Sequence, residues 1–382
     1  MKQARLDEII ERAKFDRRAP LYLRYCRITS LPESIGNLVN LTHLYLSGNQ
    51  LTSLPESIGN LFNLTHLCLS GNQLTSLPES IGNLVNLTHL HLEENQLTSL
   101  PESIVNLVNL IYLHLERNKL ASLPESIGNL VNLVHIYLCE NQLSSLPESI
   151  GNLGDLTHLN LEENYLNSLP KNIDNLVSLT YLNLGQNELA SLPESIGNLV
   201  NLTNIEPREN QLISLPESIK NLSNLNRIDF TGNPLIDLSI LKTARNLKTV
   251  RLFDVDLSRR YWTKLSEWKS EWLLIENNAE VRRALIAQIG YKKICDELGA
   301  IIVNTWREYT LLKIDGVDRF NQWDEDGETL QEIVEPMILL KMTCPSTQHI
   351  HILRVPPEMT SAEAAIIWVN HGIHPDKFAV QT

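Results

Sequence analysis

Residues 41–63 read LTHLYLSGNQLTSLPESIGNLFN, and the chain repeats this 23-residue unit over more than half of its length. Leu44 and Leu46 alternate with His43 and Tyr45, which predicts a short strand with one apolar face. Counterparts of the first leucine stand at Leu64, Leu87, Leu110, Leu133, Leu156, Leu179, Leu202 and Leu225. A fixed period in this range is typical of a solenoid, in which each copy closes the hydrophobic core of its neighbour.

The second half of the unit predicts an outer arm. Pro55 disfavours a helical conformation for Leu54, so we expect an extended start and then one short helical turn that ends near Gly59. The full pattern, LxxLxLxxNxLxxLPxxIxxLxx, resembles the leucine-rich repeat family over about two thirds of the chain. That resemblance implies an α/β solenoid with a parallel β horseshoe, in which the side-chain amide of Asn49 bonds backbone groups of adjacent turns.

Three parts are expected along the chain. Residues 1–17 contain an amphipathic helix that would cap the first repeat, residues 18–257 hold leucine-rich repeats with about eleven strands, and residues 258–382 form a small α+β domain. The last boundary rests on composition, because all six tryptophans lie beyond residue 257. Within the repeats, Pro207 replaces an inward-facing leucine and has no N–H for a neighbouring strand, which predicts a local break in strand pairing.

The C-terminal domain has a mixed pattern of helices and strands. Helices are expected at 261–275, 279–289, 291–298 and 361–370, and strands at 300–303, 309–314, 337–343 and 349–355. The acidic, glycine-containing stretch 315–328 is expected to be an exposed loop.

Two further resemblances concern the two ends of the chain, and the first of them indicates a bacterial origin. Segments 276–283, 339–343 and 353–357 of this chain resemble an uncharacterised domain of bacterial proteins. That domain carries no established activity. The start of the chain, a short helix before a degenerate first repeat, resembles the repeat region of bacterial Roc-COR proteins. Since the phosphate-loop motif GxxxxGK[ST] does not occur in the sequence, this second resemblance implies no GTPase activity.

The charge balance argues against nucleic acid and membrane as partners. The chain carries a formal net charge of −13, and residues 28–207 contain only three basic residues against 17 acidic ones. Such a surface repels phosphate backbones and anionic lipid headgroups. No apolar run has the length of a signal-peptide core or of a transmembrane helix, and the five cysteines are scattered. We therefore expect a cytoplasmic protein without a disulfide framework.

The expected strands place their variable side chains on one face. The outer arms stay nearly identical from copy to copy, whereas the outward strand positions change, so internal comparison locates the variable surface on the concave face. We predict that a protein partner with basic or apolar anchors binds there. The predicted binding residues are His66, His89, His91, Glu93, Tyr112, His114, Glu116, His135, Tyr137, His158 and Tyr181. The competing interpretation is a solvated sheet face that holds whatever the duplicated template supplied.

The concave histidines raise two further hypotheses. Imidazoles and a thiolate on neighbouring strands are ligand types of a zinc site. The residues weighed for such a site are His66, Cys68, His89, His91 and His114. Stacked parallel side chains do not converge tetrahedrally, and neither CxxC nor HExxH occurs, so we expect no metal and no other cofactor. Alternatively, protonation of adjacent imidazoles would make binding sensitive to pH, with Glu93 and Glu116 offsetting the added charge.

A catalytic role has weaker support. Cys344 and His349 flank the short turn 345–348 and could act as nucleophile and base. No third residue that would orient the histidine is identifiable, and neither is an oxyanion-hole motif. We therefore predict a scaffold whose repeats mediate protein–protein interaction rather than an enzyme. The alternative is an enzyme whose repeats recruit substrate to a C-terminal catalytic domain.

Overall fold

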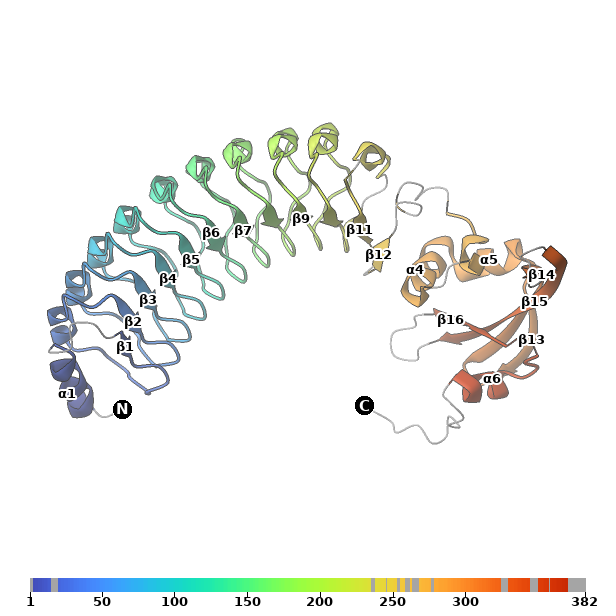
Figure 1. The fold of residues 1–382 in the computed structure, drawn as a ribbon, viewed down its shortest axis with the longest axis horizontal. Helices are drawn as coiled ribbons and strands as arrows, with labels where there is room; N and C mark the ends of the chain where they lie inside the picture. Colours follow the sequence, from blue (N-terminus) through green and yellow to red (C-terminus); the bar gives the residue numbers. More distant parts are fainter. Residues whose placement is uncertain are drawn as a thin grey trace. The chain divides into compact units, whose positions relative to one another are not determined.

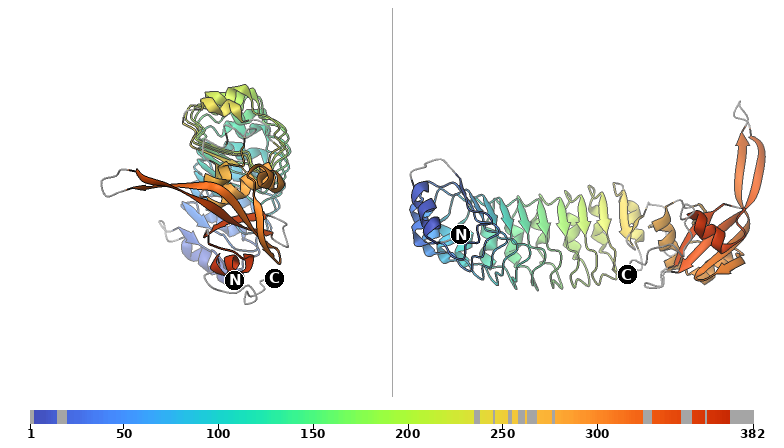
Figure 2. Two further views of the ribbon diagram at one scale, coloured as in Figure 1. Left: turned by 90° about the vertical axis from the view of Figure 1, so that its right-hand side faces the viewer. Right: turned by 90° about the horizontal axis from the view of Figure 1, so that it is seen from below.

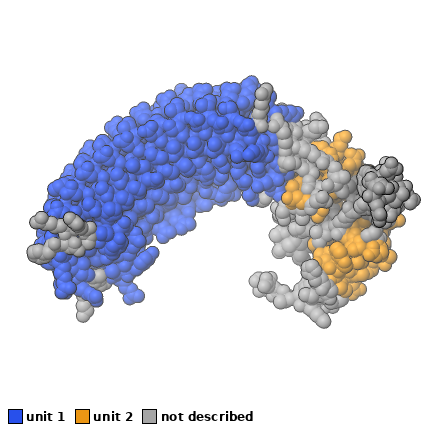
Figure 3. Space-filling model, in the orientation of Figure 1, with its two compact units in different colours: residues 1–263 blue, residues 264–382 orange. Residues whose placement is uncertain are grey.

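The computed structural model describes residues 3–14, 20–234, 238–244, 246–252, 255–257, 262, 268–275, 278–323, 329–343, 350–356 and 358–369. The chain divides into two compact units, residues 1–263 and residues 264–382, which Figure 3 colours separately. Each unit has a sheet of its own, with twelve strands in the first unit and four in the second.

The first unit is a sheet to which every repeat adds one strand. β1 to β11 pair in sequence order, each parallel to the next, and β12 pairs with β11 in the antiparallel direction. The strands are β1 (Leu21–Tyr22), β2 (His43–Tyr45), β3 (His66–Cys68), β4 (His89–His91), β5 (Tyr112–His114), β6 (His135–Tyr137), β7 (His158–Asn160), β8 (Tyr181–Asn183), β9 (Asn204–Glu206), β10 (Arg227–Asp229), β11 (Thr249–Leu252) and β12 (Val255–Leu257). The constant period explains the register, because each strand meets the equivalent residues of the next copy, as Leu44 meets Leu67. The expected solenoid is confirmed.

The outer arm of each repeat forms a short 3-10 helix. Pro55 is extended, with φ −70° and ψ 152°, and the helix that follows spans Glu56–Asn60, so the expected extended start and short turn are confirmed. The 3-10 helices are η1 (Glu33–Asn37), η2 (Glu56–Asn60), η3 (Glu79–Asn83), η4 (Glu102–Asn106), η5 (Glu125–Asn129), η6 (Glu148–Asn152), η7 (Ile173–Asn175), η8 (Glu194–Asn198), η9 (Glu217–Asn221) and η10 (Ser239–Thr243). Figure 1 shows these helices on the outer, convex side of the first unit and the strands on its inner, concave side.

Apolar side chains of neighbouring copies fill the space between strands and arms. Leu44, Leu46, Leu51, Ile58 and Leu61 are fully buried, and their counterparts in the following copies are buried as well. Burying one such side chain contributes about 1.5–3 kcal/mol. A single copy cannot bury these side chains by itself, so the stability of the unit comes from the contacts between neighbouring copies.

A ladder of buried asparagines satisfies the backbone groups where the chain leaves each strand. The Oδ1 atom of Asn49 accepts hydrogen bonds from the N–H groups of Cys26 and Ile28, both at 3.0 Å. Its Nδ2 atom donates to the carbonyl oxygens of Leu23 and Leu46, both at 2.7 Å. Equivalent bonds recur at Asn72, Asn95, Asn118, Asn141, Asn164, Asn187, Asn210 and Asn233. The role that the resemblance implied for this asparagine is thus present along the sheet.

Pro207 interrupts the backbone ladder, as expected. It is buried directly after β9, where other copies donate an N–H group to the next strand. In the preceding copy, Leu184 makes this bond to the carbonyl oxygen of Glu206 at 3.0 Å. Proline cannot make it, and β9 shares two residue pairs with β10, whereas β8 and β9 share three. The predicted local break in pairing is confirmed.

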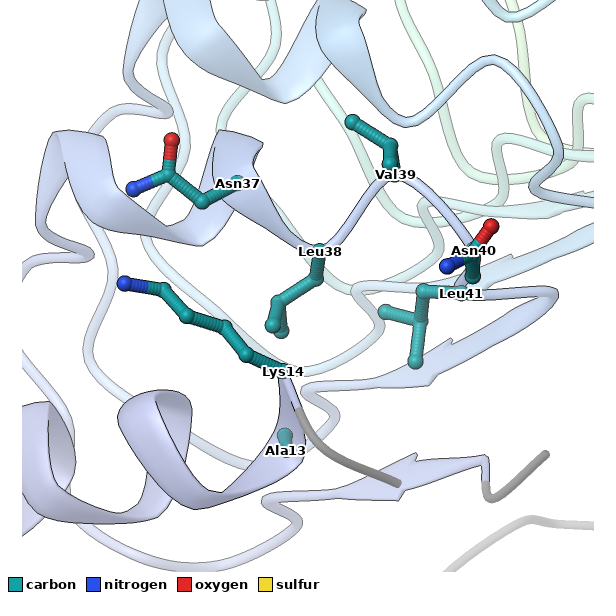
Figure 4. Close-up of a pocket in the computed structure, with 7 residues that line it drawn as sticks. All are labelled: Ala13, Lys14, Asn37, Leu38, Val39, Asn40 and Leu41. Atoms are coloured by element: carbon teal, nitrogen blue, oxygen red, sulfur yellow. The ribbon is translucent and has the colours of Figure 1, made fainter. Parts of the chain in front are cut away.

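Helix α1 (Gln3–Ala13) covers the open end of the first repeats. Its apolar side chains Leu6 and Ile10 are buried, and the helix contacts η1. Figure 4 shows the end of α1, with Lys14, across a small pocket from the turn that contains Leu41. The pocket measures about 20 Å³, which is room for one water molecule. It is therefore a gap in the packing of the helix rather than a ligand site.

The second unit is an antiparallel sheet with helices on both faces. Its elements are α3 (Trp272–Ile275), α4 (Ala279–Ile289), α5 (Tyr291–Glu297), β13 (Ile301–Trp306), β14 (Tyr309–Trp323), β15 (Thr329–Thr343), β16 (Ile350–Val355) and α6 (Ala362–Val369), and the strands pair in chain order. On β14, Leu312 packs with Ile286 of α4 and Ile294 of α5, whereas Leu311 packs with Ile366 of α6. Adjacent strand residues point to opposite faces, so a sheet covered on both sides requires such consecutive apolar residues. The expected small α+β domain is confirmed.

The prediction of a loop at 315–328 is wrong for residues 315–323, the part of this stretch that the structure describes. β14 continues to Trp323 and β15 begins at Thr329, and pairs such as Asp318 with Glu335 extend the ladder. Figure 2 shows the two strands running together away from the rest of the second unit. Acidic residues and a glycine predicted a loop, but an antiparallel partner supplies backbone hydrogen bonds whatever the charge of the side chains.

The helix expected at 261–275 is wrong in part. Within residues 268–275, only Trp272–Ile275 is α-helical. The N–H groups of Trp272 and Leu273 donate to the carbonyl oxygens of Lys269 and Ser270, three residues earlier, at 3.0 and 3.1 Å, so a tighter turn stands where a continuous α-helix was expected. Among the described helices of the chain, none combines the length and the hydropathy needed to cross a lipid bilayer.

Candidate functional site on the concave face

The strands of the first unit present three rows of side chains on the concave face. Each row joins the same position of successive copies, because the strands pair in register. The first row is His43, His66, His89, Tyr112, His135, His158, Tyr181, Asn204 and Arg227. The second row is Tyr45, Cys68, His91, His114, Tyr137, Asn160, Asn183, Glu206 and Asp229. The third row is Ser47, Ser70, Glu93, Glu116, Cys139 and Glu162. All eleven residues that the sequence predicted for binding lie in these rows and are half-buried.

The rings of the first row form one continuous stack. Neighbouring ring centroids lie 4.1–5.8 Å apart along seven rings, with interplanar angles of 11–27°. The seven rings are those of His43, His66, His89, Tyr112, His135, His158 and Tyr181. Offset stacking at this spacing is favourable for aromatic rings, and strands about 4.8 Å apart impose it on rings in equivalent positions.

Threonines that precede four of the five first-row histidines orient these four rings. The hydroxyl group of Thr65 lies 3.0 Å from Nδ1 of His66 and donates to the carbonyl oxygen of Thr42, also at 3.0 Å. The pair formed by Thr88 and His89 repeats this arrangement. A hydroxyl group has one proton, and here the threonine donates it to the carbonyl oxygen. The hydroxyl oxygen must therefore accept a hydrogen bond from the imidazole, which means that Nδ1 carries the ring proton. Nε2 of each neutral ring is then left as a hydrogen-bond acceptor.

Burial keeps the imidazoles of His66, His89, His135 and His158 neutral near pH 7. Burial, followed by the neighbouring imidazoles of His89 and His43, lowers the pKa of His66 from 6.5 to about 4. Burial is also the largest cause that lowers the pKa values of His89, His135 and His158. The stack therefore presents uncharged rings with acceptor nitrogens rather than a row of cations.

The second and third rows combine rings with carboxylates. The ring centroid of His114 lies 4.5 Å from that of His91 and 4.6 Å from that of Tyr137. Nδ1 of His114 lies 3.1 Å from Oε1 of Glu116, and Nδ1 of His91 lies 3.7 Å from Oε2 of Glu93. Burial acts to raise the pKa of Glu93, but the nearby imidazole of His91 and, less strongly, that of His114 outweigh it, so this pKa lies below its usual value. The carboxylate is ionised at neutral pH.

One cluster among the described residues could supply three ligands to a metal ion. Ligand atoms of His91, Glu93 and His114 all lie within 4.8 Å of one another. The other imidazoles weighed from the sequence, His66 and His89, belong to the first row and lie outside this cluster.

The thiols of the concave face are poor nucleophiles. Burial raises the pKa of Cys68, and burial together with the charge of Glu116 raises the pKa of Cys139 to about 11. Both are therefore protonated at neutral pH, whereas the nucleophile is the thiolate. The proposed catalytic pair, Cys344 and His349, lies outside the described residues.

A groove of about 730 Å³ runs beside the first row, and sequence reasoning missed it. It is lined by Asn63, Thr65, Asn86, Thr88, Asn109, Ile111, Asn132 and Val134. Its asparagines donate to carbonyl oxygens of the preceding copy, as Nδ2 of Asn86 does to Phe62 at 2.8 Å. The available signal was the recurrence of asparagine at positions 63, 86, 109 and 132, but a residue that only stabilises the backbone would recur in the same way.

Comparison with family models covers the repeats. A model described as "Leucine-rich repeat region" matches residues 56–138, 104–180 and 147–272, and a second, "Leucine rich repeat", matches residues 20–74. The first model alone spans more than half of the chain. The comparison with curated proteins found no match.

Solved structures with a similar fold are also leucine-rich repeat proteins or receptors. A leucine-rich repeat protein of Leptospira interrogans is 34% identical, with a TM-score of 0.52, over 59% of this chain and 64% of that one. The plant peptide hormone receptor RGFR1, in complex with RGF2, is 31% identical, with a TM-score of 0.50, over 59% and 41% of the two chains. The PEPR1–AtPEP1 crystal structure is 34% identical, with a TM-score of 0.54, over 62% of this chain and 35% of that one. The chain spans less than two thirds of each of these relatives. With its repeats matched over more than half of its length, the chain belongs to the leucine-rich repeat family.

Proposed function

We propose that the repeats bind an extended segment of a partner protein along the concave face. The observation that carries this proposal is the first-row stack, whose neutral imidazoles offer a line of acceptor nitrogens beside ionised carboxylates. Such a surface suits hydrogen-bond donors that carry positive charge, because bonds with a charged member contribute about 1.5–3 kcal/mol each.

The rings also suit a flat cationic or apolar side chain. Within the chain itself, the guanidinium group of Arg24 lies 4.4 Å from the ring centroid of Tyr45, at the end of the second row. A partner arginine could lie in the same way over a ring face at the end of a stack, where no neighbouring ring covers it, since a cation over an aromatic face contributes about 0.5–2 kcal/mol. We therefore infer a partner segment with arginine, lysine or apolar anchors, and the acidic third row disfavours nucleic acid.

The similar structures support this assignment at a coarser level. RGFR1 is a plant peptide hormone receptor in complex with RGF2, and another similar structure is the pair PEPR1–AtPEP1. In our proposal, residues 1–17 cap the repeats, residues 18–257 carry the binding surface, and residues 258–382 form a separate domain.

A peptide library tests the proposal while the partner is unidentified. Peptides selected on the full chain at pH 7.5 are expected to be rich in arginine, lysine and aromatic residues. Their affinities are then measured by calorimetry on a triple variant in which His66, His89 and His158, each oriented by a preceding threonine, are changed to Phe. This change keeps the ring stack but removes three acceptor nitrogens, so we expect affinity to fall at least tenfold, the equivalent of about 1.4 kcal/mol.

The matched control changes exposed apolar residues in the same copies. Val85, Val108 and Val177 lie in the copies of His66, His89 and His158, outside the three rows, and are 43–56% exposed. Their triple replacement by Ala should leave the affinity unchanged. Peptides that bind the phenylalanine variant as well as wild type, or that are lost in the alanine variant, would show that the concave imidazoles are not the binding surface.

A further inference from the structure

We propose that His91, Glu93 and His114 form a binding site for one divalent transition-metal ion, with Zn²⁺ as the best match. Their ligand atoms already lie within 4.8 Å of one another on adjacent strands. His91 and His114 are register partners on β4 and β5, and Glu93 lies two residues after His91, on the same face. Two imidazole nitrogens and a carboxylate oxygen are a ligand set that suits Zn²⁺.

A carboxylate oxygen that lacks a partner supports the site independently. Oε2 of Glu93 is shielded from solvent, and no hydrogen bond to it exists within the described part of the chain. Its nearest basic atom is Nδ1 of His91, at 3.7 Å. An ionised oxygen out of contact with water is costly unless a cation or donors compensate it. A metal ion between Glu93 and the two imidazoles would supply that compensation.

A second carboxylate orients one of the proposed ligands. Oε1 of Glu116 lies 3.1 Å from Nδ1 of His114. Metal-bound histidines commonly donate their other ring N–H to a carboxylate, which fixes the orientation of the ring and leaves one nitrogen for the metal. Glu116 is therefore a positioning residue for His114 in this proposal.

The sequence singles out these two copies. His-Leu-Glu occurs at 91–93 and again at 114–116, and the other copies do not combine a second-row histidine with a third-row glutamate. On sequence grounds no metal was expected, because stacked side chains do not converge on four tetrahedral positions. A site with three protein ligands needs less convergence, because its fourth position is open to water or to a bound side chain. Metal–ligand bonds of about 2.1 Å place ligand atoms about 3.4 Å apart, so side-chain rotations must close the present separations of up to 4.8 Å.

Zinc titration of the full chain tests the site. By calorimetry with Zn²⁺ at pH 7.5, we expect wild type to bind one ion. The His91→Ala and Glu93→Gln variants should each bind Zn²⁺ with an affinity at least tenfold lower than that of wild type. Glu116→Gln should weaken binding about 10- to 100-fold, as loss of an orienting carboxylate does. Zn²⁺ should also raise the melting temperature of wild type but not of the isosteric Glu93→Gln variant.

The control is the neighbouring carboxylate. Glu94 is exposed and pairs with Arg117 at 3.0 Å outside the cluster, so Glu94→Gln should bind Zn²⁺ as wild type does. Co²⁺ in place of Zn²⁺ should show the visible bands of a nitrogen and oxygen site without a thiolate charge-transfer band. The proposal is overturned if wild type binds no ion, if Glu93→Gln binds as wild type does, or if a thiolate band places the metal at a cysteine.

Discussion

The outer arm and the concave strand of each repeat follow opposite rules of variation. The arm sequence ESIGN is identical in η1, η2, η3, η5, η6 and η8, whereas the strand that faces it reads HLY, HLC, HLH, YLH and HIY in consecutive copies. Contacts explain the contrast. A Cβ atom on Gly59 would lie 2.4 Å from the backbone oxygen of Ser80 in the next copy. On the concave face, either His or Tyr can occupy a row position, because the distance between neighbouring ring centroids is similar for both.

The neighbouring copy thus favours glycine in the arm, which Val105 and Lys220 replace in η4 and η9, whereas the strand surface changes from copy to copy. Where the backbones of two copies are closely packed, even one added methylene group lowers stability. Half-exposed side chains tolerate replacement, so variation there costs little stability and is available for recognition. Substitutions at interior, arm and concave positions test this contrast.

The largest effect is expected at the asparagine ladder. Asn118 donates to the carbonyl oxygens of Leu92 and Leu115, both at 3.0 Å, and accepts from the N–H group of Leu97 at 2.9 Å. Asn118→Ala leaves these buried groups without partners, each at about 1–3 kcal/mol. We expect the free energy of unfolding to fall by about 3 kcal/mol or more in urea titrations. The exposed Asn132, which donates once to Val108, is the control, and its replacement by Ala should cost less than about 1 kcal/mol.

A medium effect is expected at the arm glycine. In Gly82→Ala the new Cβ would lie 2.4 Å from the backbone oxygen of Ser103, so the copies must move apart, at about 1–3 kcal/mol. Gly154→Ala is the matched control, because no atom lies within 4 Å of its Cβ position. It should be neutral or slightly stabilising. Equal losses of thermal stability in both variants would contradict the idea that the neighbouring copy favours glycine in the arm.

The smallest effect is expected from pH at the first row. The folded pKa of His66 is about 4 and those of His135 and His158 are lowered, against 6.5 for an unfolded chain. Between these values the unfolded chain binds more protons, so the free energy of unfolding should fall as pH drops from about 7 to about 5 and stay level above about pH 7. Screening around half-exposed rings limits this to about 1 kcal/mol for each ring.

Urea titrations at pH 5 and 7 measure this dependence. In a variant with His66, His135 and His158 replaced by Gln, the difference between the two pH values should shrink by more than half. A variant with the same pH dependence as wild type would show that other groups cause it.

The sequence predicted the repeats well because each residue has the same surroundings in every copy. The strand alternation at Leu44 and Leu46, the turn asparagine and the proline-led arm each recur many times, so a local preference is reinforced by all copies. In the second unit every element occurs once. There, local composition predicted a loop at 315–328 and a long helix at 261–275, and tertiary pairing produced a different result for the described residues.

The sequence alone was sufficient for the solenoid, its period and the residues of the concave face, because a 23-residue repeat fixes which side chains are equivalent. It could not determine how equivalent side chains meet. The stacking of the first-row rings, the threonine bonds that select their tautomer, and the approach of His91, Glu93 and His114 all lie across strands. Distances between residues that are 23 apart in the sequence exist only once the sheet has formed, so they follow from the tertiary structure.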